Sequence, residues 1–239
     1  MLLLATLGAR AQGSGAALGE LALGRADAPV TMVEYASLTC PHCARFHAET
    51  LPQIKAAYID TGKVRLVFRD FPFDRLALAG AVVARCGGPE RYFGLLEVLF
   101  RQQQSWAKAP EPLKELLQIG RLAGLSEQQV EACLKDEALQ DRISQTRLEG
   151  EQTHKVKSTP SFLIDGQLIS GAQSFAEIAT LLDAALAKRP APAPGPAGGG
   201  NRSDVDLFST ANMLIATGVV LTGAAVIVFF LSRRKSGAG

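Results

Sequence analysis

The stretch that decides the fold reads Val30-Thr31-Met32-Val33-Glu34-Tyr35-Ala36 and continues, after three residues, with Cys40-Pro41-His42-Cys43. The apolar run is rich in β-forming residues and predicts a strand over 30–36. Proline suits the first position of a helix, because its missing N–H would be unpaired there in any case, so Pro41 predicts a helix that begins at this point. Cys40 is then expected at the helix N-terminus, with its sulfur facing free N–H groups and the positive end of the helix dipole.

Two cysteines with two residues between them can close a disulfide across the first turn of a helix. The helix N-terminus favours the thiolate of Cys40, and His42 can add a second stabilising charge. A lowered pKa makes Cys40 a thiolate at neutral pH and a good leaving group in thiol–disulfide exchange. The motif therefore predicts a redox-active pair, Cys40–Cys43, that serves as its own cofactor.

The rest of the chain predicts alternating helices and strands followed by a helical stretch. We expect a helix over 44–59 that is kinked at Pro52 and ended by Gly62, followed by a strand over 64–71. Residues of about 73–154 are expected to form helices without a strand. A hairpin of 162–164 and 167–169, turning at Asp165-Gly166, and a helix from Ser174 to about 187 complete the predicted order. Within the helical stretch, breaks are expected at 87–89, 108–112 and 124–126, and Ser126 with Gln129 predicts a capping box. Parallel strands joined through helices, followed by an antiparallel hairpin, are typical of a mixed sheet in an α/β fold.

With Thr159-Pro160 placed before the hairpin, the sequence over about 18–188 resembles the DsbA-like thiol–disulfide oxidoreductases of the thioredoxin superfamily. The dipeptide Pro41-His42 is the one found in the archetypal oxidase of that family. The resemblance implies a thioredoxin fold in which a helical subdomain, about 73–154, is inserted. It also implies that Pro160 is cis and lies against the active-site disulfide.

The resemblance further implies roles for individual residues. Glu34, six residues before Cys40, matches a buried acid beneath the second cysteine and would exchange a proton with Cys43. The simpler alternative for Glu34 is a surface carboxylate, although a carboxylate in an apolar strand is costly without a task. For His42, the alternative to a stabilising charge is an exposed loop histidine.

The substrate is expected to bind beside the pair of prolines. Pro160 would shape the groove together with Pro41, and Thr159 would offer backbone groups to an extended peptide in the manner of an added strand. The alternative for Thr159-Pro160 is an ordinary turn before a strand. Thr159 also departs from the archetypal oxidase, which has valine there, so reductase or isomerase activity remains an alternative to oxidation.

Two other classes of function remain as alternatives. Cys40, Cys43 and His47 have a spacing that could hold zinc or copper, but no second pair of ligands is nearby and we expect His47 to be solvated, so no metal site is predicted. The other alternative is a tethered chaperone or adaptor without redox turnover. The net charge of +2, from 25 basic and 23 acidic residues, suggests no nucleic-acid partner.

Cys86 and Cys133 are the remaining cysteines and are far apart in the sequence. They either form a structural disulfide or are two small buried apolar residues on helices. A bridge over roughly 47 residues would stabilise the fold by up to about 4 kcal/mol and would require an oxidising compartment.

The segments outside the domain predict export and a membrane anchor. Residues 1–11 resemble the end of a secretory signal, whose start we expect to lie upstream, although an apolar N-terminus without a role is the alternative. Residues 189–204 are a Pro/Gly-rich linker. Residues 211–231 carry no charge and would form a helix of about 31 Å, long enough to span a membrane. The basic tail, 232–239, is then expected in the cytoplasm, which places the domain outside.

These expectations combine into one hypothesis about location and partners. The chain would be a single-pass protein of the cytoplasmic membrane, with its catalytic domain in the periplasm or outside the cell. Its substrates would be exported proteins with free thiols. A quinone-linked membrane oxidase as the partner that reoxidises it is implied by the family resemblance alone.

Overall fold

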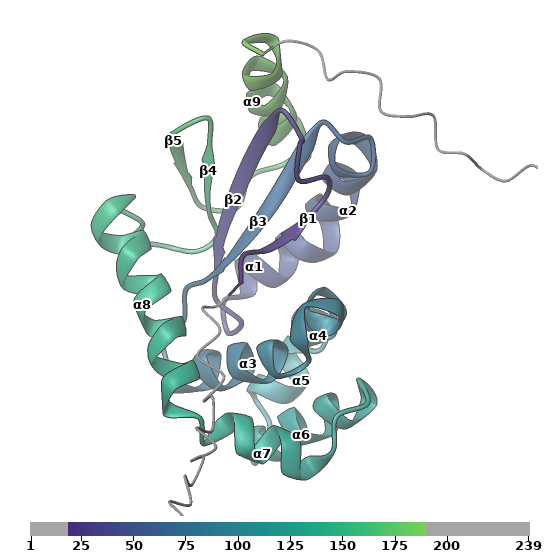
Figure 1. Cartoon of the computed structure of the whole chain (residues 1–239), viewed down its shortest axis with the longest axis vertical. Coiled ribbons are helices and arrows are strands. Elements are labelled where there is room, and N and C mark those ends of the chain that lie inside the picture. The colour runs from purple at the N-terminus through teal and green to yellow at the C-terminus, as the bar shows by residue number, and fades with distance from the viewer. Residues whose placement is uncertain (1–18, 190–239) are drawn as a thin grey trace, which may run out of the picture. The chain divides into compact units, whose positions relative to one another are not determined.

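The computed structural model describes residues 19–189, and these form the domain shown in Figure 1. At its centre is a five-stranded sheet in the order β1-β3-β2-β4-β5. The strands are β1 (Leu21–Leu23), β2 (Val30–Ala36), β3 (Val64–Asp70), β4 (Ser161–Ile164) and β5 (Gln167–Ser170). Strands β2 and β3 are parallel, whereas the other neighbouring pairs are antiparallel. The predicted mixed sheet is thus confirmed, with β1 added at one edge, where three residues are too few to show a periodic pattern.

The helix that follows the cysteine motif is continuous from Pro41 to Ile59 but contains two π-helical turns. It consists of α1 (Pro41–Arg45), η1 (Phe46–Thr50), α2 (Leu51–Ile54) and η2 (Lys55–Ile59). The wide turn η1 comes just before Pro52, where the sequence predicts a kink. Gly62, at φ +74°, reverses the chain after the helix.

The two faces of the sheet are covered by different helices. Alternate residues of β2 point to opposite faces, so Val30 and Met32 share a face. Both lie in one apolar core with the helix after Cys40 and with α9 (Phe175–Ala187). On the opposite face, Tyr35 packs against α8 (Glu137–Thr153). Gly150 of α8 permits this approach, because a Cβ there would lie 2.6 Å from Cε1 of Tyr35.

The stretch between β3 and β4 is helical, as predicted, and forms a second core. Besides α8 it comprises α3 (Arg75–Cys86), α4 (Gly88–Arg101), α5 (Gln103–Ala107), α6 (Pro112–Leu122) and α7 (Glu127–Leu134). A junction between helices occurs at each of the three predicted breaks, although Gly88-Pro89 and Pro112 already belong to the helices that follow. Two further breaks, at Gln102 and at 135–136, were not predicted because neither contains glycine or proline.

Local capping and turn signals in the sequence are also confirmed. Ser126 and Gln129 form the predicted capping box at the start of α7. Ser174 caps α9, as expected from the sequence. Asp165 at φ +51° and Gly166 at φ +79° form the turn between β4 and β5, consistent with the predicted type I′ hairpin.

Cys86 and Cys133 form a disulfide that ties the end of α3 to α7. The sequence left open whether these cysteines are bridged or are two buried apolar residues. The structure shows the disulfide, which joins residues 47 positions apart. Replacing both by alanine is expected to lower the free energy of unfolding by about 2–4 kcal/mol, because the unfolded chain then loses a long cross-link. Urea denaturation of the two proteins without reductant measures this difference, and equal midpoints would contradict it.

The predicted segments at the ends of the chain lie outside the described residues. These are the signal-like residues 1–11, almost all of the linker 189–204, the apolar run 211–231 and the tail 232–239. Within residues 19–189, no helix has both the length and the apolar character needed to span a membrane.

Candidate active site

Cys40 occupies the N-cap position of α1, where the sequence analysis expects it. Its backbone is extended, with φ −80° and ψ 117°, and Pro41 begins the helix. Cys40 is half-buried, whereas Cys43, one turn further along the helix, is fully buried. Both are free thiols in the structure. Because of this difference in burial, a partner can reach the sulfur of Cys40 but not that of Cys43.

The environment separates the acidities of the two thiols. The pKa of Cys40 is lowered to about 5, chiefly because the Cys43 thiol donates a hydrogen bond to its sulfur. The Thr159 side chain and the backbone N–H groups of Cys43 and His42 add to this effect, and burial opposes it. Burial strongly raises the pKa of Cys43, and the neighbouring Cys40 raises it further. At neutral pH, Cys40 is therefore a thiolate and Cys43 a thiol.

This separation predicts how the reduced protein responds to pH. The ultraviolet absorbance of the thiolate should titrate with a midpoint near 5, and the rate of Cys40 alkylation should fall below that pH. Since the folded-state pKa lies below the ordinary value of 9.0, the stabilisation by this thiolate is complete above about pH 9. It is lost as the pH falls through about 5. A midpoint above neutrality would contradict the geometry around Cys40.

The segment before β4 brings Thr159 and Pro160 against the cysteine pair. The Thr159–Pro160 peptide bond is cis. Sγ of Cys40 lies 3.3 Å from the Thr159 carbonyl oxygen, to which Cys40 donates when it is in the thiol form. The Thr159 hydroxyl is buried and has no hydrogen-bond partner in the described part of the chain, and the Thr159 side chain lowers the pKa of the nearby Cys40.

Pro41 and His42 lie at the exposed rim of the site, whereas Pro160 is buried beside it. The backbone N–H of His42 is one of the groups that lower the pKa of Cys40. The side chain of His42 is open to solvent, where it can meet a bound peptide.

Glu34 lies at the centre of β2 and is fully buried, so the surface-carboxylate alternative is wrong. Its Oε1 is 2.9 Å from Nε2 of His47, and its Oε2 has no hydrogen-bond partner within the described residues. The charge of Glu34 is also among the causes that raise the pKa of Cys43. A buried carboxylate thus lies near the buried thiol, as the resemblance implied.

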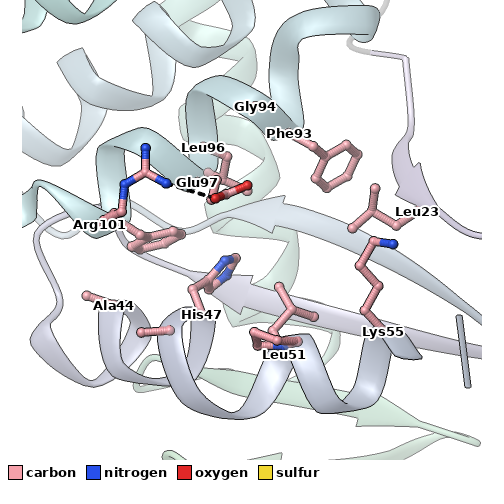
Figure 2. A pocket seen from close by; sticks show the side chains of 13 residues that line it. Leu23, Ala44, His47, Leu51, Lys55, Phe93, Gly94, Leu96, Glu97 and Arg101 are labelled. Atoms are coloured by element: carbon pink, nitrogen blue, oxygen red, sulfur yellow. Dashed lines mark hydrogen bonds and ion pairs between the residues drawn. The ribbon is translucent and has the colours of Figure 1, made fainter. Parts of the chain in front are cut away.

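The expectation that His47 is solvated is wrong. Only 7% of its side chain is exposed. The ring packs on Phe100 of α4, with centroids 4.1 Å apart, and its Nε2 is bonded to Glu34. Figure 2 shows His47 reaching from its helix toward α4, on the wall of a pocket. In the metal-binding alternative, His47 would have to coordinate one ion together with the thiols of Cys40 and Cys43. Residues 19–189 contain no cluster of three side chains arranged to hold a metal ion.

Gln103 of α5 is a site residue that the sequence analysis did not find. It is 2% exposed, and its Nε2 donates to the carbonyl oxygens of Leu38, at 2.8 Å, and Cys40, at 2.9 Å. A side chain of the helical insertion therefore fixes the loop that carries the reactive cysteine. Because the contact spans 63 residues, no local pattern could have revealed it.

The comparisons with known proteins agree with this geometry. The family model described as Thioredoxin matches residues 16–184. A Rickettsia bellii protein, provisionally named a protein-disulfide oxidoreductase, is 34% identical over 152 residues, which are 62% of this chain and 57% of that protein. The Bacillus subtilis protein named disulfide bond formation protein D is 26% identical over 180 residues, covering 70% of this chain and 78% of that one.

Solved structures show the same fold. The crystal structure of Wolbachia pipientis alpha-DsbA1 is similar with a TM-score of 0.67 at 30% identity, covering 71% of this chain and 92% of that one. The chain spans less than two thirds of the length of the Rickettsia relatives. The family model, the similar crystal structure and the arrangement around Cys40 and Cys43 all agree. The chain belongs to the thioredoxin family, as a DsbA-like member.

Proposed function

We propose that this chain is a thiol–disulfide oxidoreductase that introduces disulfides into exported proteins through Cys40 and Cys43. The observation that carries the proposal is the half-buried Cys40 with a pKa near 5 beside the buried Cys43. A stabilised Cys40 thiolate favours the reduced protein, which makes the disulfide form an oxidant. The names of the relatives support the same class of activity.

The proposed reaction transfers two electrons from substrate to protein. A substrate thiolate attacks Sγ of Cys40, the Cys40–Cys43 bond breaks, and its electron pair goes to the sulfur of Cys43. Because burial raises the pKa of Cys43, this sulfur takes up a proton, which Glu34 is placed to supply. A second substrate thiolate then attacks the substrate sulfur of the mixed disulfide, and Cys40 leaves as a thiolate. The products are a substrate disulfide and the reduced pair.

The substrate would lie along the segment that contains the cis peptide bond. The Thr159 carbonyl oxygen is already within hydrogen-bonding distance of Cys40, so a peptide bound at Thr159 would have its cysteine beside the accessible sulfur. Pro160 fixes the course of this segment, and Pro41 forms the opposite rim.

The place of action is part of the proposal. The disulfide between Cys86 and Cys133 suits an oxidising compartment, and the apolar run 211–231 suits a membrane anchor that leaves the domain outside the cytoplasm. A quinone-linked membrane oxidase that accepts electrons from the reduced pair follows from the family resemblance.

The experiment is a single-turnover reaction of the full chain with a peptide that contains two cysteines. The chain is first oxidised with glutathione disulfide, and the peptide is then followed by mass spectrometry after acid quenching. We expect one peptide disulfide per chain, and no disulfide in a control peptide with one cysteine replaced by serine. If the reduced chain instead opens peptide disulfides while the oxidised chain leaves dithiols intact, the protein is a reductase and the proposed direction is wrong.

A further inference from the structure

Proton exchange at Cys43 faces a physical obstacle. Cys43 must gain a proton when the disulfide opens and lose one when it closes again, yet Cys43 and Glu34 are both 0% exposed. A carboxyl group sealed from water can give up one proton, but it cannot be protonated again without a second group that reaches solvent. The group bonded to Glu34 is His47.

His47 connects Glu34 to a cavity. One ring nitrogen, Nε2, lies 2.9 Å from Glu34, while Nδ1 has no hydrogen-bond partner within residues 19–189. The side chain lines a cavity of about 580 Å³ between the helix after Cys40 and α4 (Figure 2). The two nitrogens of an imidazole can take up a proton on one side and release it on the other.

The cavity wall is mostly apolar. Leu23, Leu51 and Phe93 lie on it, and its charged groups are Lys55, Glu97 and Arg101. Glu97 of α4 is paired with Arg101 at 3.0 Å, and Lys55 is paired with Asp60 at 2.6 Å. Besides these, the titratable groups around His47 are Glu34 on β2 and Cys43 one turn earlier on the same helix. Among them, only His47 touches both the cavity and Glu34.

We propose that His47 is a positioning and proton-relay residue that carries protons between solvent in this cavity and Glu34, and so sets the rate of every step at Cys43. The inference rests on the proposed function of the cysteine pair. When the disulfide opens, Glu34 gives its proton to the Cys43 sulfur. Solvent then protonates Nδ1 of His47, and the ring passes its Nε2 proton to the Glu34 carboxylate. When the disulfide closes, the same transfers run backwards, so the ring regains its first tautomer.

The first test separates the two steps of oxidation of the reduced full chain by glutathione disulfide. Acid quenching and mass spectrometry distinguish the mixed disulfide at Cys40 from the closed Cys40–Cys43 pair. His47→Gln keeps a donor toward Glu34 but cannot relay a proton. We expect it to slow closure at least about 10-fold at neutral pH while leaving mixed-disulfide formation unchanged. His154→Gln, the same change at a histidine outside the site, should alter neither step.

The second test asks whether a small base can replace the side chain. His47→Ala enlarges the cavity at the position of the ring, so added imidazole should restore closure in a saturable manner. Pyrazole, which has the same size but does not take up a proton near neutral pH, should not restore it. Wild-type closure rates in both His47 variants would overturn the proposal. Slow closure that neither compound restores, or that both restore equally, would also overturn it, because His47 would then serve only in packing.

The outcome is independent of the direction of the physiological reaction. Closure by glutathione disulfide is measured on the cysteine pair itself, whereas the proposed function fails if the wild-type chain forms no disulfide in a dithiol peptide. The experiments therefore show separately whether the proton relay through His47 fails and whether the proposed oxidase function fails.

Discussion

Replacing Cys40 by serine is expected to abolish peptide oxidation by the full chain, with a loss of at least about 1,000-fold. Cys40 is the sulfur that a partner can reach, and it is the one whose thiolate the surroundings stabilise. Cys43 is fully buried with a raised pKa, so it cannot take over the first step. A serine oxygen forms no disulfide, and both the oxidised state and the mixed disulfide are lost.

Cys43→Ser is the matched variant and should behave differently. It keeps a reactive Cys40 but lacks the sulfur that would release a bound partner. Incubated with a peptide disulfide, it should accumulate a covalent adduct with the mass of chain plus peptide, reversed by reductant. Cys40→Ser should form no such adduct. An adduct on Cys40→Ser, or none on Cys43→Ser, would mean that Cys40 is not the group attacked first.

Replacing Arg85 by leucine is expected to lower the free energy of unfolding by about 3–5 kcal/mol. Arg85 of α3 pairs with Asp70 at the end of β3, with 2.5 Å between Nη2 and Oδ2. The side chains are 7% and 2% exposed, and the Tyr92 hydroxyl donates to the other carboxylate oxygen at 3.3 Å. Burial raises the pKa of Asp70, and Arg85 opposes this. Without Arg85, the buried Asp70 carboxylate keeps the Tyr92 hydroxyl but has no cationic partner among the described residues.

Urea denaturation measures this loss, and two variants control for it. Arg121→Leu removes an exposed ion pair, in which Nη1 of Arg121 lies 3.9 Å from Oε2 of Glu127. This change should alter the free energy of unfolding by less than about 1 kcal/mol. Adding Asp70→Asn to Arg85→Leu should recover part of the loss, because the buried charge is then absent. Since the Asp70 carboxyl binds a proton more readily without Arg85, the loss should also be larger in mildly alkaline than in acidic buffer. Equal losses for Arg85→Leu and Arg121→Leu would contradict this picture.

The central elements of the fold could be predicted because their signals are local. Pro41 sets the start of the helix, Asp165-Gly166 sets the turn of the hairpin, and Ser126 with Gln129 caps a helix. Each depends on residues within one turn of one another, so it can be recognised without knowledge of tertiary contacts. The edge strand Leu21–Leu23 gives no such signal, because it is held by its pairing with β3.

The reactive cysteines could be located from the sequence, but the groups that support them could not. Gln103 acts across 63 residues on the Cys40 carbonyl, which only the packed structure reveals. For His47, a usable signal was present. It lies four residues after Cys43 and therefore on the same helix face as the buried thiol. The wide turn that begins at Phe46, together with Phe100 from α4, completes its burial.

The most direct measurement of whether this protein is an oxidant is the reduction potential of the Cys40–Cys43 pair in the full chain, equilibrated against glutathione. A thiolate stabilised to a pKa near 5 makes the reduced form favourable, so we predict a potential closer to about −120 mV than to about −270 mV. A value near about −270 mV, typical of a thioredoxin that reduces its partners, would contradict the proposed direction of electron flow.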